Sequence, residues 1–293
     1  MRILCVHAHF DDYEFFCSGT FELFRRRHGP ALRARLLVCT DGAAGHHWRT
    51  REETARMRLA EQHASARIGG YQFELLRLPD GRVPREGCLE AGPGLLAALW
   101  KAIRDFEPDY LFCPPLPSDP LAGVHVDHLV VAEAVRRVAY LINVPHAFTP
   151  EYPAEETRSR PCQVPVILSL FDSYLAGASA YDFAVDTEEV FPLTCEMSWC
   201  HQSQIREWLP WVGRHNLESP ATLDEWAVAL RRRFLARNRA LGVDLPRMLE
   251  FFTVTKWGTV PAFERLTDDI PNLFTQTPHL DRLKVRLSQA HSI

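Results

Sequence analysis

The stretch Ile3-Leu4-Cys5-Val6, followed directly by HAHFDDYEF at residues 7–15, decides how the rest of the chain is interpreted. Its four consecutive apolar residues predict a short strand that is buried on both faces, as in a parallel sheet. Two histidines, two adjacent aspartates and one glutamate then fall within residues 7–14. We therefore expect a buried strand that presents ionisable side chains at its carboxyl end.

The remainder of the chain alternates short apolar runs with amphipathic stretches. Strands are predicted at residues 35–40, 73–78, 110–113, 166–170 and 183–185, and helices at 15–27, 50–68, 93–106, 126–140 and from 222 to about 238. This alternation indicates parallel strands joined by crossover helices. The predicted fold is a three-layer, open, mostly parallel α/β sheet in a single domain covering residues 1–293.

Residues 144–165 differ in character, because five prolines interrupt any regular element there. A surface crossover loop is the favoured interpretation. A lid over a functional site is the alternative, because long loops in compact domains are often functional.

Composition excludes several classes of protein. With 33 basic and 37 acidic residues the formal net charge is -4, which does not favour nucleic acid or an anionic membrane as partner. No apolar run approaches the roughly 20 residues needed to span a bilayer, and the first residues carry too short an apolar run for a secretory signal. The eight cysteines are scattered without a disulfide-like spacing. We therefore expect a reduced, cytoplasmic protein.

Three polar clusters follow predicted strands. The first is the 7–14 cluster, including Glu14, the second is Asp41, and the third comprises His125, Asp127 and His128. In an open α/β sheet, ligands bind outside the carboxyl ends of the strands. The three clusters are therefore expected to converge on one site.

A metal is the first chemistry that these residue types suggest. Imidazole nitrogens and carboxylate oxygens suit zinc, and a catalytic zinc keeps three protein ligands and one open position. His9 and Asp12 are candidate ligands from one loop, with His128 as the third; another divalent ion such as Fe²⁺ would also suit this set. Each of these histidines, taken alone, is more commonly structural, and only the combination predicts a metal site.

Other residues of the clusters are suited to proton transfer. Asp11 lies beside a candidate ligand and is a reasonable general base for an activated water. His125, three residues before His128, can face the same cavity and, as an imidazolium, stabilise an oxyanion and protonate a leaving amine. Asp127 can orient one of the histidines.

At these residues the sequence resembles a known family. HAHFDDYEF is similar to the A-H-P-D-D-x-E signature of the LmbE-like, or PIG-L-type, zinc-dependent N-acetylglucosaminyl deacetylases, and residues 125–128 (HVDH) resemble their H-x-D-H motif. Smaller similarities occur at Thr40-Asp41-Gly42, at Arg58-x-x-Glu61, at residues 78–81 and at the H-x-S-Q segment 201–204. Together these similarities span residues 3 to about 204, in the order of the family.

The resemblance implies a Rossmann-like sheet and removal of an N-acetyl group from an amino sugar or sugar conjugate. It implies His9, Asp12 and His128 as zinc ligands, Asp11 as base and His125 as electrostatic or acid partner. Supporting or substrate-contacting candidates are Asp127, Glu14, Asp41, Arg58 and His201. The implied partner is a small N-acetylated sugar; homo-oligomerisation is left open.

The chain also departs from the family pattern. Phe10 replaces the usual proline, which places a bulky ring near the expected site, and Thr194 stands where relatives often have lysine. Residues from about 205 to 293 have no counterpart in the resemblance and are expected to add variable helices and a tail. For Arg58, a solvated surface position or a helix pair with Glu61 is favoured over a ligand contact. His46 and His47 are expected to line the pocket rather than bind metal.

Three other functions fit the sequence less well. A non-catalytic sugar-binding or regulatory module on the same scaffold would suit the departures at Phe10 and Thr194. An amidohydrolase-type (β/α)₈ barrel could begin with His7 and His9 as its H-x-H pair, although too few strands are predicted. Dinucleotide binding is disfavoured, because acids rather than a glycine-rich loop follow the first strand.

Overall fold

The computed structural model describes residues 1–293 apart from 118, 120, 158–160, 173–180, 214–217 and 291–293. Its strands form one eight-stranded sheet in the order β3-β2-β1-β4-β5-β7-β6-β8. The strands are β1 (Arg2–His7), β2 (Arg33–Val38), β3 (Gln72–Leu75), β4 (Tyr110–Cys113), β5 (Val166–Leu170), β6 (Phe183–Asp186), β7 (Leu249–Val254) and β8 (Leu273–Phe274).

Ten α-helices and four short helical segments connect and cover these strands in the described residues. The α-helices are α1 (Asp12–Phe16), α2 (Ser18–His28), α3 (Arg51–Gly69), α4 (Pro93–Phe106), α5 (Val126–Leu141), α6 (Phe191–Trp199), α7 (Leu209–Val212), α8 (Leu223–Ala240), α9 (Phe263–Asp269) and α10 (His279–Ala290). The short segments are η1 (Gly29–Ala31), η2 (Pro153–Thr157) and η3 (Glu188–Val190), which are 3₁₀-helices, and η4 (Ser203–Trp208), which is a π-helix.

The sheet is parallel in its first half and antiparallel in its second. All pairings among β3, β2, β1, β4 and β5 are parallel. Strand β7 pairs antiparallel with both β5 and β6, and β8 pairs antiparallel with β6. The carboxyl ends of β1, β2, β4 and β5 therefore lie along one edge, where the polar clusters were expected to meet.

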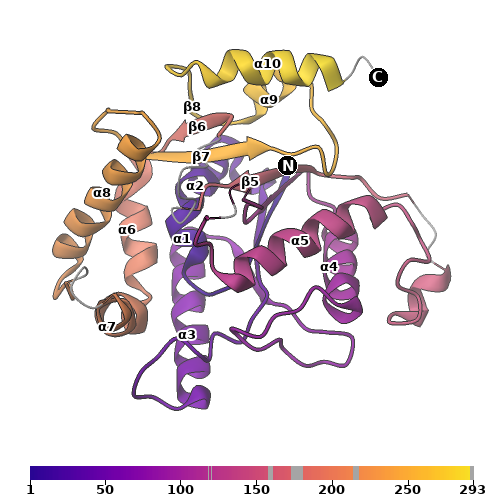
Figure 1. Ribbon diagram of the computed structural model, residues 1–293, viewed down its shortest axis with the longest axis horizontal. Helices are drawn as coiled ribbons and strands as arrows, with labels where there is room; N and C mark the ends of the chain where they lie inside the picture. Colours follow the sequence, from indigo (N-terminus) through magenta and orange to yellow (C-terminus); the bar gives the residue numbers. More distant parts are fainter. Residues whose placement is uncertain (118, 120, 158–160, 173–180, 214–217, 291–293) are drawn as a thin grey trace.

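The central strand β1 is buried on both faces, as its unbroken apolar sequence predicted. Ile3 and Cys5 belong to one hydrophobic core, whereas Leu4 and Val6 belong to the core on the opposite face. Helices α4 and α5 cover the Leu4 face, and α2, α9 and α10 contribute to the other. The alternation of strand side chains thus produces the three layers visible in Figure 1.

Several predicted elements are confirmed, and the fold class with them. The helix at 93–106 and the strands at 110–113 and 166–170 have the expected bounds. The single helix expected at 15–27 was wrong: α1 ends at Phe16 and α2 begins at Ser18, because Cys17 leaves the helical conformation with φ −150°. The open sheet also excludes the (β/α)₈ barrel.

The proline-rich connection after α5 packs at the end of that helix far from His128. Phe148 lies against Trp100 of α4, with ring centroids 5.8 Å apart, and the Cys162 N–H donates to Asn143. The described part of residues 144–165 is therefore a crossover that covers the α4–α5 layer. The lid interpretation finds no support in these contacts.

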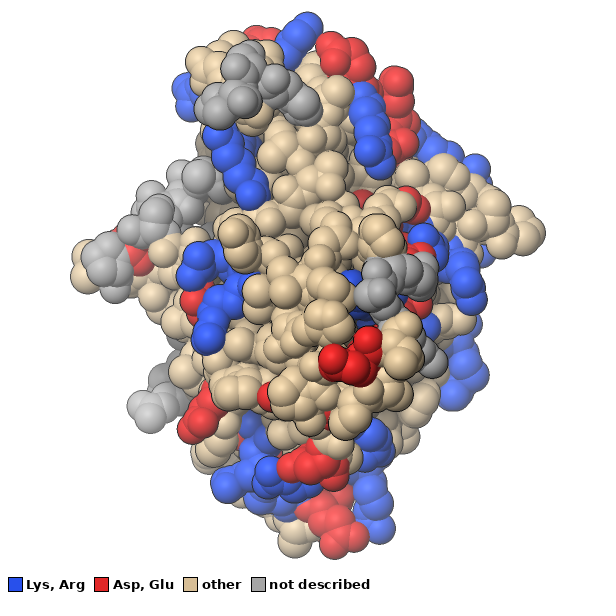
Figure 2. Space-filling model, turned by 90° about the vertical axis from the view of Figure 1, so that its right-hand side faces the viewer, with Lys and Arg blue, Asp and Glu red and all other residues tan. Residues whose placement is uncertain are grey.

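Figure 2 shows basic and acidic side chains interspersed over one face of the molecule. Among the described helices, none is both long enough and apolar enough to traverse a bilayer.

Candidate metal and active site

The loop between β1 and α1 places the first site residues. Asp11 has a left-handed backbone with φ 80°, which few side chains other than those of Asp and Asn tolerate. This turn brings Asp12 to the start of α1, where its Oδ2 accepts the His9 N–H at 2.8 Å. The sequence HFDD therefore folds into a tight loop that presents His9 and Asp12 on the same side.

Helix α5 supplies the third side chain to the same point. His9 Nδ1 lies 3.2 Å from His128 Nε2 and 3.3 Å from Asp12 Oδ2, and His128 Nε2 lies 3.2 Å from Asp12 Oδ2. The three atoms thus form a nearly equilateral triangle. All three residues are buried.

This triangle fits one face of a zinc coordination tetrahedron. Ligand atoms at about 2.0–2.1 Å from a tetrahedral ion are separated from one another by about 3.3–3.4 Å. The observed spacings of 3.2–3.3 Å agree closely with that geometry. The donor set of two imidazoles and one carboxylate is also one that zinc accepts.

Two carboxylates hold the histidines in the orientation that metal binding requires. Asp127 Oδ2 lies 3.1 Å from His9 Nε2, and Asp172 Oδ2 lies 2.8 Å from His128 Nδ1. Each carboxylate accepts the ring N–H on one side of its imidazole, so the other nitrogen faces Asp12 and would bind a metal once its proton is released. The geometry agrees with the orienting role expected for Asp127.

Asp172 was missed in the sequence. It lies two residues after β5, at the same edge of the sheet as the other clusters. The rule that selected residues after β1, β2 and β4 would also have selected it.

A second combination of ligands shares two members with the first. His7 Nδ1 lies 2.5 Å from Asp12 Oδ2, so His7, Asp12 and His128 also come within metal-binding range. However, the His7 Nδ1 already accepts the Ala8 N–H at 3.0 Å. Among the described contacts His9 Nδ1 faces His128 and Asp12 and accepts no backbone N–H, so the first combination is the better metal site.

The electrostatics of the triangle favour a cation at its centre. Burial lowers the pKa of His9, but the Asp12 and Asp127 carboxylates together outweigh burial and raise the pKa to about 9. For His128 the same balance gives a pKa of about 10. Despite burial, His7, His9 and His128 in turn hold the pKa of Asp12 well below its ordinary value. A divalent ion would replace these ring protons as the partner of Asp12.

Asp11 lies beside the triangle in a separate set of contacts. Its Oδ1 accepts from Arg58 Nη2 at 3.1 Å, and its backbone N–H donates to Gln62 Oε1 at 3.2 Å. Burial raises the pKa of Asp11 to about 6, although the Arg58 guanidinium opposes the shift. A carboxylate with this pKa is suited to accept a proton near neutral pH.

His125 is the most exposed of the converging residues and caps helix α5. Its Nδ1 accepts the Asp127 N–H at 3.1 Å, so a neutral ring carries its proton on Nε2. Its ring centroid lies 4.5 Å from that of His9. Burial and the neighbouring histidines lower the pKa of His125, which disfavours the imidazolium expected from the sequence. The neutral ring still offers an Nε2–H donor.

Glu14 and His201 form a buried polar cluster behind the loop rather than a ligand contact. Glu14 Oε1 accepts from Gln62, Ser65 and Tyr71, and lies 3.4 Å from His201 Nε2. Both residues are fully buried. This agrees with a supporting role for Glu14. His201 was a candidate for substrate contact, and its complete burial argues against that role.

Asp41 and Arg58 also have structural partners. Asp41 accepts the backbone N–H groups of Ala43 and Glu86 and pairs with Arg51, so it fixes the loop between β2 and α3. Arg58 was expected at the solvated surface or paired with Glu61, and this was wrong. Its side chain is 2% exposed and reaches Asp11.

The two departures from the family pattern are both buried. Phe10 is fully buried, with its ring 5.9 Å from that of Phe73 and over Gly42. Its ring also lies 5.7 Å from the Arg58 guanidinium, and Arg58 contacts Asp11, so the ring is near the site as expected, although it packs into the hydrophobic core. Thr194 is also buried, on α6 within hydrogen-bond distance of Ser18, so it does not reach a ligand.

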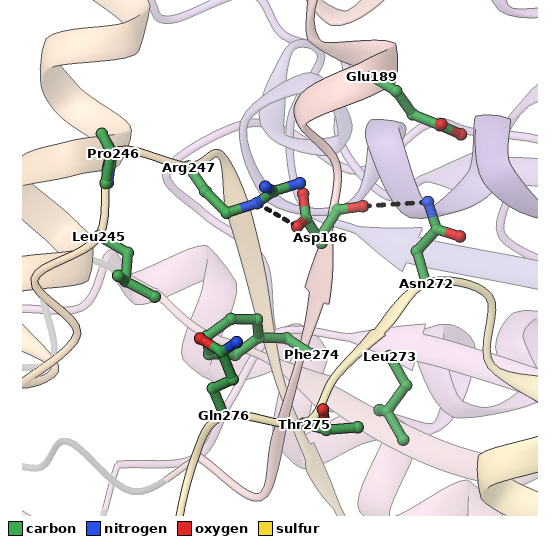
Figure 3. A pocket seen from close by; sticks show the side chains of 10 residues that line it. All are labelled: Asp186, Glu189, Leu245, Pro246, Arg247, Asn272, Leu273, Phe274, Thr275 and Gln276. Carbon is green, nitrogen blue, oxygen red and sulfur yellow. Dashed lines mark hydrogen bonds and ion pairs between the residues drawn. The ribbon is translucent and has the colours of Figure 1, made fainter.

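A hollow at the far edge of the sheet is separate from this site. It lies beside β6 and β8 and has Asp186, Arg247, Asn272 and Phe274 among its lining residues (Figure 3). Two of its charged groups pair with each other, since Arg247 donates to Asp186. The proposed metal ligands are not among the residues that line it.

The fold and the site together define an α/β protein with a buried His/Asp group able to bind a metal ion. Residues 4–139 match the profile of the PIG-L family, described as GlcNAc-PI de-N-acetylase. The resemblance to the PIG-L-type, LmbE-like family is therefore confirmed. A search of curated proteins finds no match.

Solved structures show how widely this fold occurs. N,N'-diacetylchitobiose deacetylase from Pyrococcus horikoshii is 19% identical, with a TM-score of 0.66 over 87% of this chain and 84% of that one. A conserved protein from Thermus thermophilus is 22% identical, with a TM-score of 0.59 over 86% and 93%. A 4-carboxy-2-hydroxymuconate hydratase from Pseudomonas putida is 16% identical, with a TM-score of 0.57 over 87% and 95%. At these identities the likeness concerns the fold alone.

Proposed function

We propose that this protein is a zinc-dependent N-deacetylase that hydrolyses the acetyl amide of an N-acetylated amino sugar or sugar conjugate. The observation that carries the proposal is the triangle of His9, Asp12 and His128 with Asp11 beside it. The family match over residues 4–139 supports the reaction class. The deacetylase from Pyrococcus horikoshii supports the same reaction on this fold.

His9, Asp12 and His128 would hold the metal. When bound, zinc supplies Lewis-acid activation of a water molecule and polarisation of the acetyl carbonyl. Asp127 and Asp172 orient the two imidazoles through their hydrogen bonds, so that the opposite ring nitrogens are aimed at the metal position.

The remaining steps belong to Asp11 and His125. Asp11 takes a proton from the attacking water as the C–O bond forms, and Arg58 and Gln62 hold it in place. The Nε2–H of His125 donates a hydrogen bond to the oxyanion that develops on the acetyl oxygen. When the C–N bond breaks, the proton held by Asp11 passes to the leaving nitrogen, which releases acetate and the free amine.

Acetate release tests the proposal. Zinc-reconstituted protein should release acetate from at least one N-acetyl sugar, and a chelator should abolish the activity until zinc is restored. Asp11→Asn should bind zinc like the wild type and lose at least about 100-fold in kcat, the lower end of what a general base contributes. His9→Ala should lose zinc itself.

Two outcomes would contradict the assignment. Asp11→Asn with near wild-type turnover would exclude Asp11 as the base. A zinc-loaded protein that binds N-acetyl sugars but never releases acetate would instead support the non-catalytic sugar-binding module.

A further inference from the structure

Aromatic side chains gather at the surface where the loop after β2 meets the π-helix η4 and α7. The ring of His47 stacks on Trp211 at 4.7 Å and 3°, and Trp211 stacks on Trp208 at 5.3 Å and 26°. Trp48 contacts His47 edge to face at 6.4 Å. We refer to His47, Trp48, Trp208 and Trp211 as the aromatic rim.

Much of this rim faces solvent. Trp48 is 61% exposed and Trp211 is 54% exposed, which are high values for indole side chains. Such clustered exposed apolar surface commonly marks a binding site.

Paired charges hold the rim in place. Glu207 of η4 lies 2.8 Å from His46 Nε2 and accepts from Arg49 Nη2 at 3.1 Å. The Arg49 guanidinium in turn lies 3.9 Å from the ring centroid of Trp48. The loop and η4 are thus joined before any ligand arrives, which lowers the cost of ordering them on binding.

The rim is continuous with the proposed active site through Gly45. The Gly45 carbonyl accepts from Gln204 Nε2 at 3.1 Å. A Cβ at this position would lie 3.1 Å from Arg58 Nη1 and 3.5 Å from Trp208 Nε1. Gly45 therefore lies between Trp208 and Arg58, and Arg58 itself contacts Asp11.

The hollow beside Trp48 indicates the chemistry of the ligand. Its lining combines one indole and one thioether with charged, hydrogen-bonding groups, from Trp48, Arg49, Glu53, Arg56 and Met57. A pyranose ring has a C–H face that suits the electron-rich face of an indole and hydroxyl groups that suit charged side chains. The charged side chains of the hollow are already paired, Arg49 with Glu207, Glu53 with Thr50 and Arg56 with Glu52. A neutral ring that carries hydroxyl groups can hydrogen-bond to them without displacing these pairs.

We propose that the aromatic rim binds a second sugar ring, linked to the N-acetylated sugar whose acetyl group is removed. This inference rests on the proposed deacetylase function. It makes the preferred substrate a disaccharide or longer saccharide conjugate rather than a free monosaccharide, and it assigns Trp48 as a specificity-determining residue.

The test compares N-acetylglucosamine with its β-1,4-linked dimer as substrates of wild type and Trp48→Ala. The substitution should raise KM for the dimer about three- to tenfold and leave kcat on both sugars and KM for the monomer within about twofold. Trp48→Phe should restore most of the loss. Tyr140→Ala is the matched control, because Tyr140 is 86% exposed on α5 and should change neither substrate.

Other results would overturn the inference. An equal change in KM for both sugars in Trp48→Ala, or no change for either, would exclude a second-ring site at the aromatic rim. An equal dependence on Trp48 for the octyl glycoside of N-acetylglucosamine would show that the rim binds apolar groups instead.

If wild type released acetate from neither sugar, the deacetylase proposal would fail for these substrates. Calorimetric measurement of dimer binding would then test separately whether the aromatic rim binds a second sugar ring. Weaker binding to Trp48→Ala than to wild type would support the second-ring site, and equal binding would exclude it.

Discussion

Removal of the carboxylate of Asp172 should weaken zinc binding without touching a ligand. Asp172 Oδ2 lies 2.8 Å from His128 Nδ1, while His128 Nε2 lies 3.2 Å from Asp12 Oδ2. The hydrogen bond fixes the tautomer and raises the basicity of the coordinating nitrogen. In Asp172→Ala both effects are lost, and the buried ring is free to rotate.

The size of the effect follows from this single bond. Loss of a carboxylate that orients a metal-bound histidine costs about 10- to 100-fold in metal affinity, or about 1.4–2.7 kcal/mol. Asp172→Asn should lie between wild type and Asp172→Ala, because an amide oxygen still accepts the His128 N–H but carries no charge.

Zinc affinity can be measured by competition with a chromophoric chelator at fixed pH. Asp182→Asn is the matched control, because Asp182 accepts the Val254 N–H at the other end of the sheet and should leave zinc affinity unchanged. Thermal unfolding of the zinc-free variants would show that each retains its fold. Wild-type zinc affinity in Asp172→Ala would refute the role derived for Asp172.

Three further predictions concern residues around the site and at the surface. Arg58→Met should lower the free energy of unfolding by about 3–5 kcal/mol in urea, because it leaves the buried Asp11 carboxylate without its partner; a loss below about 1 kcal/mol would contradict this. Gln62→Leu should cost about 1–3 kcal/mol of stability and reduce kcat, yet keep zinc, because it removes the acceptor of the Asp11 N–H; unchanged kcat would exclude it as a positioning residue. Burial raises the pKa of Glu188, but Arg231, the Met248 N–H and Arg247 together outweigh burial and hold the pKa below its ordinary value. The stability that the Glu188 carboxylate adds is therefore fully present above the unfolded pKa of about 4.3. It is lost as the pH falls through the lowered pKa of the folded state, so the free energies of unfolding of wild type and Glu188→Gln in urea should converge at acid pH. A difference in free energy that stays constant with pH would contradict this.

The first half of the fold could be predicted because its signals are local. Continuous apolar runs marked the strands, and the parallel arrangement then placed His9 and His128 at one edge although 119 positions separate them. Strand β7 was missed because its place between β5 and β6 depends on antiparallel pairing with strands distant in sequence. Gln62 was missed for a similar reason, since only the folded chain brings α3 against the Asp11 backbone.

Burial produced the other differences. Arg58 and His201 have polar side chains typical of a surface, and the sequence gives no sign that each meets a buried carboxylate. The same burial changes the role of His125, because neighbouring histidines disfavour the charged form. Buried charged residues are therefore the features of this site that are hardest to predict from a single sequence.

The left-handed backbone of Asp11 restricts which substitutions could remove the proposed base and still preserve the fold. Only glycine, asparagine and aspartate adopt that conformation readily, and of these only aspartate offers a carboxylate base. Asn at position 11 would preserve the turn while removing the proton acceptor, whereas Ala would also strain the loop that carries His9 and Asp12. We therefore expect inactive paralogues that retain the metal triangle to carry Asn or Gly at this position.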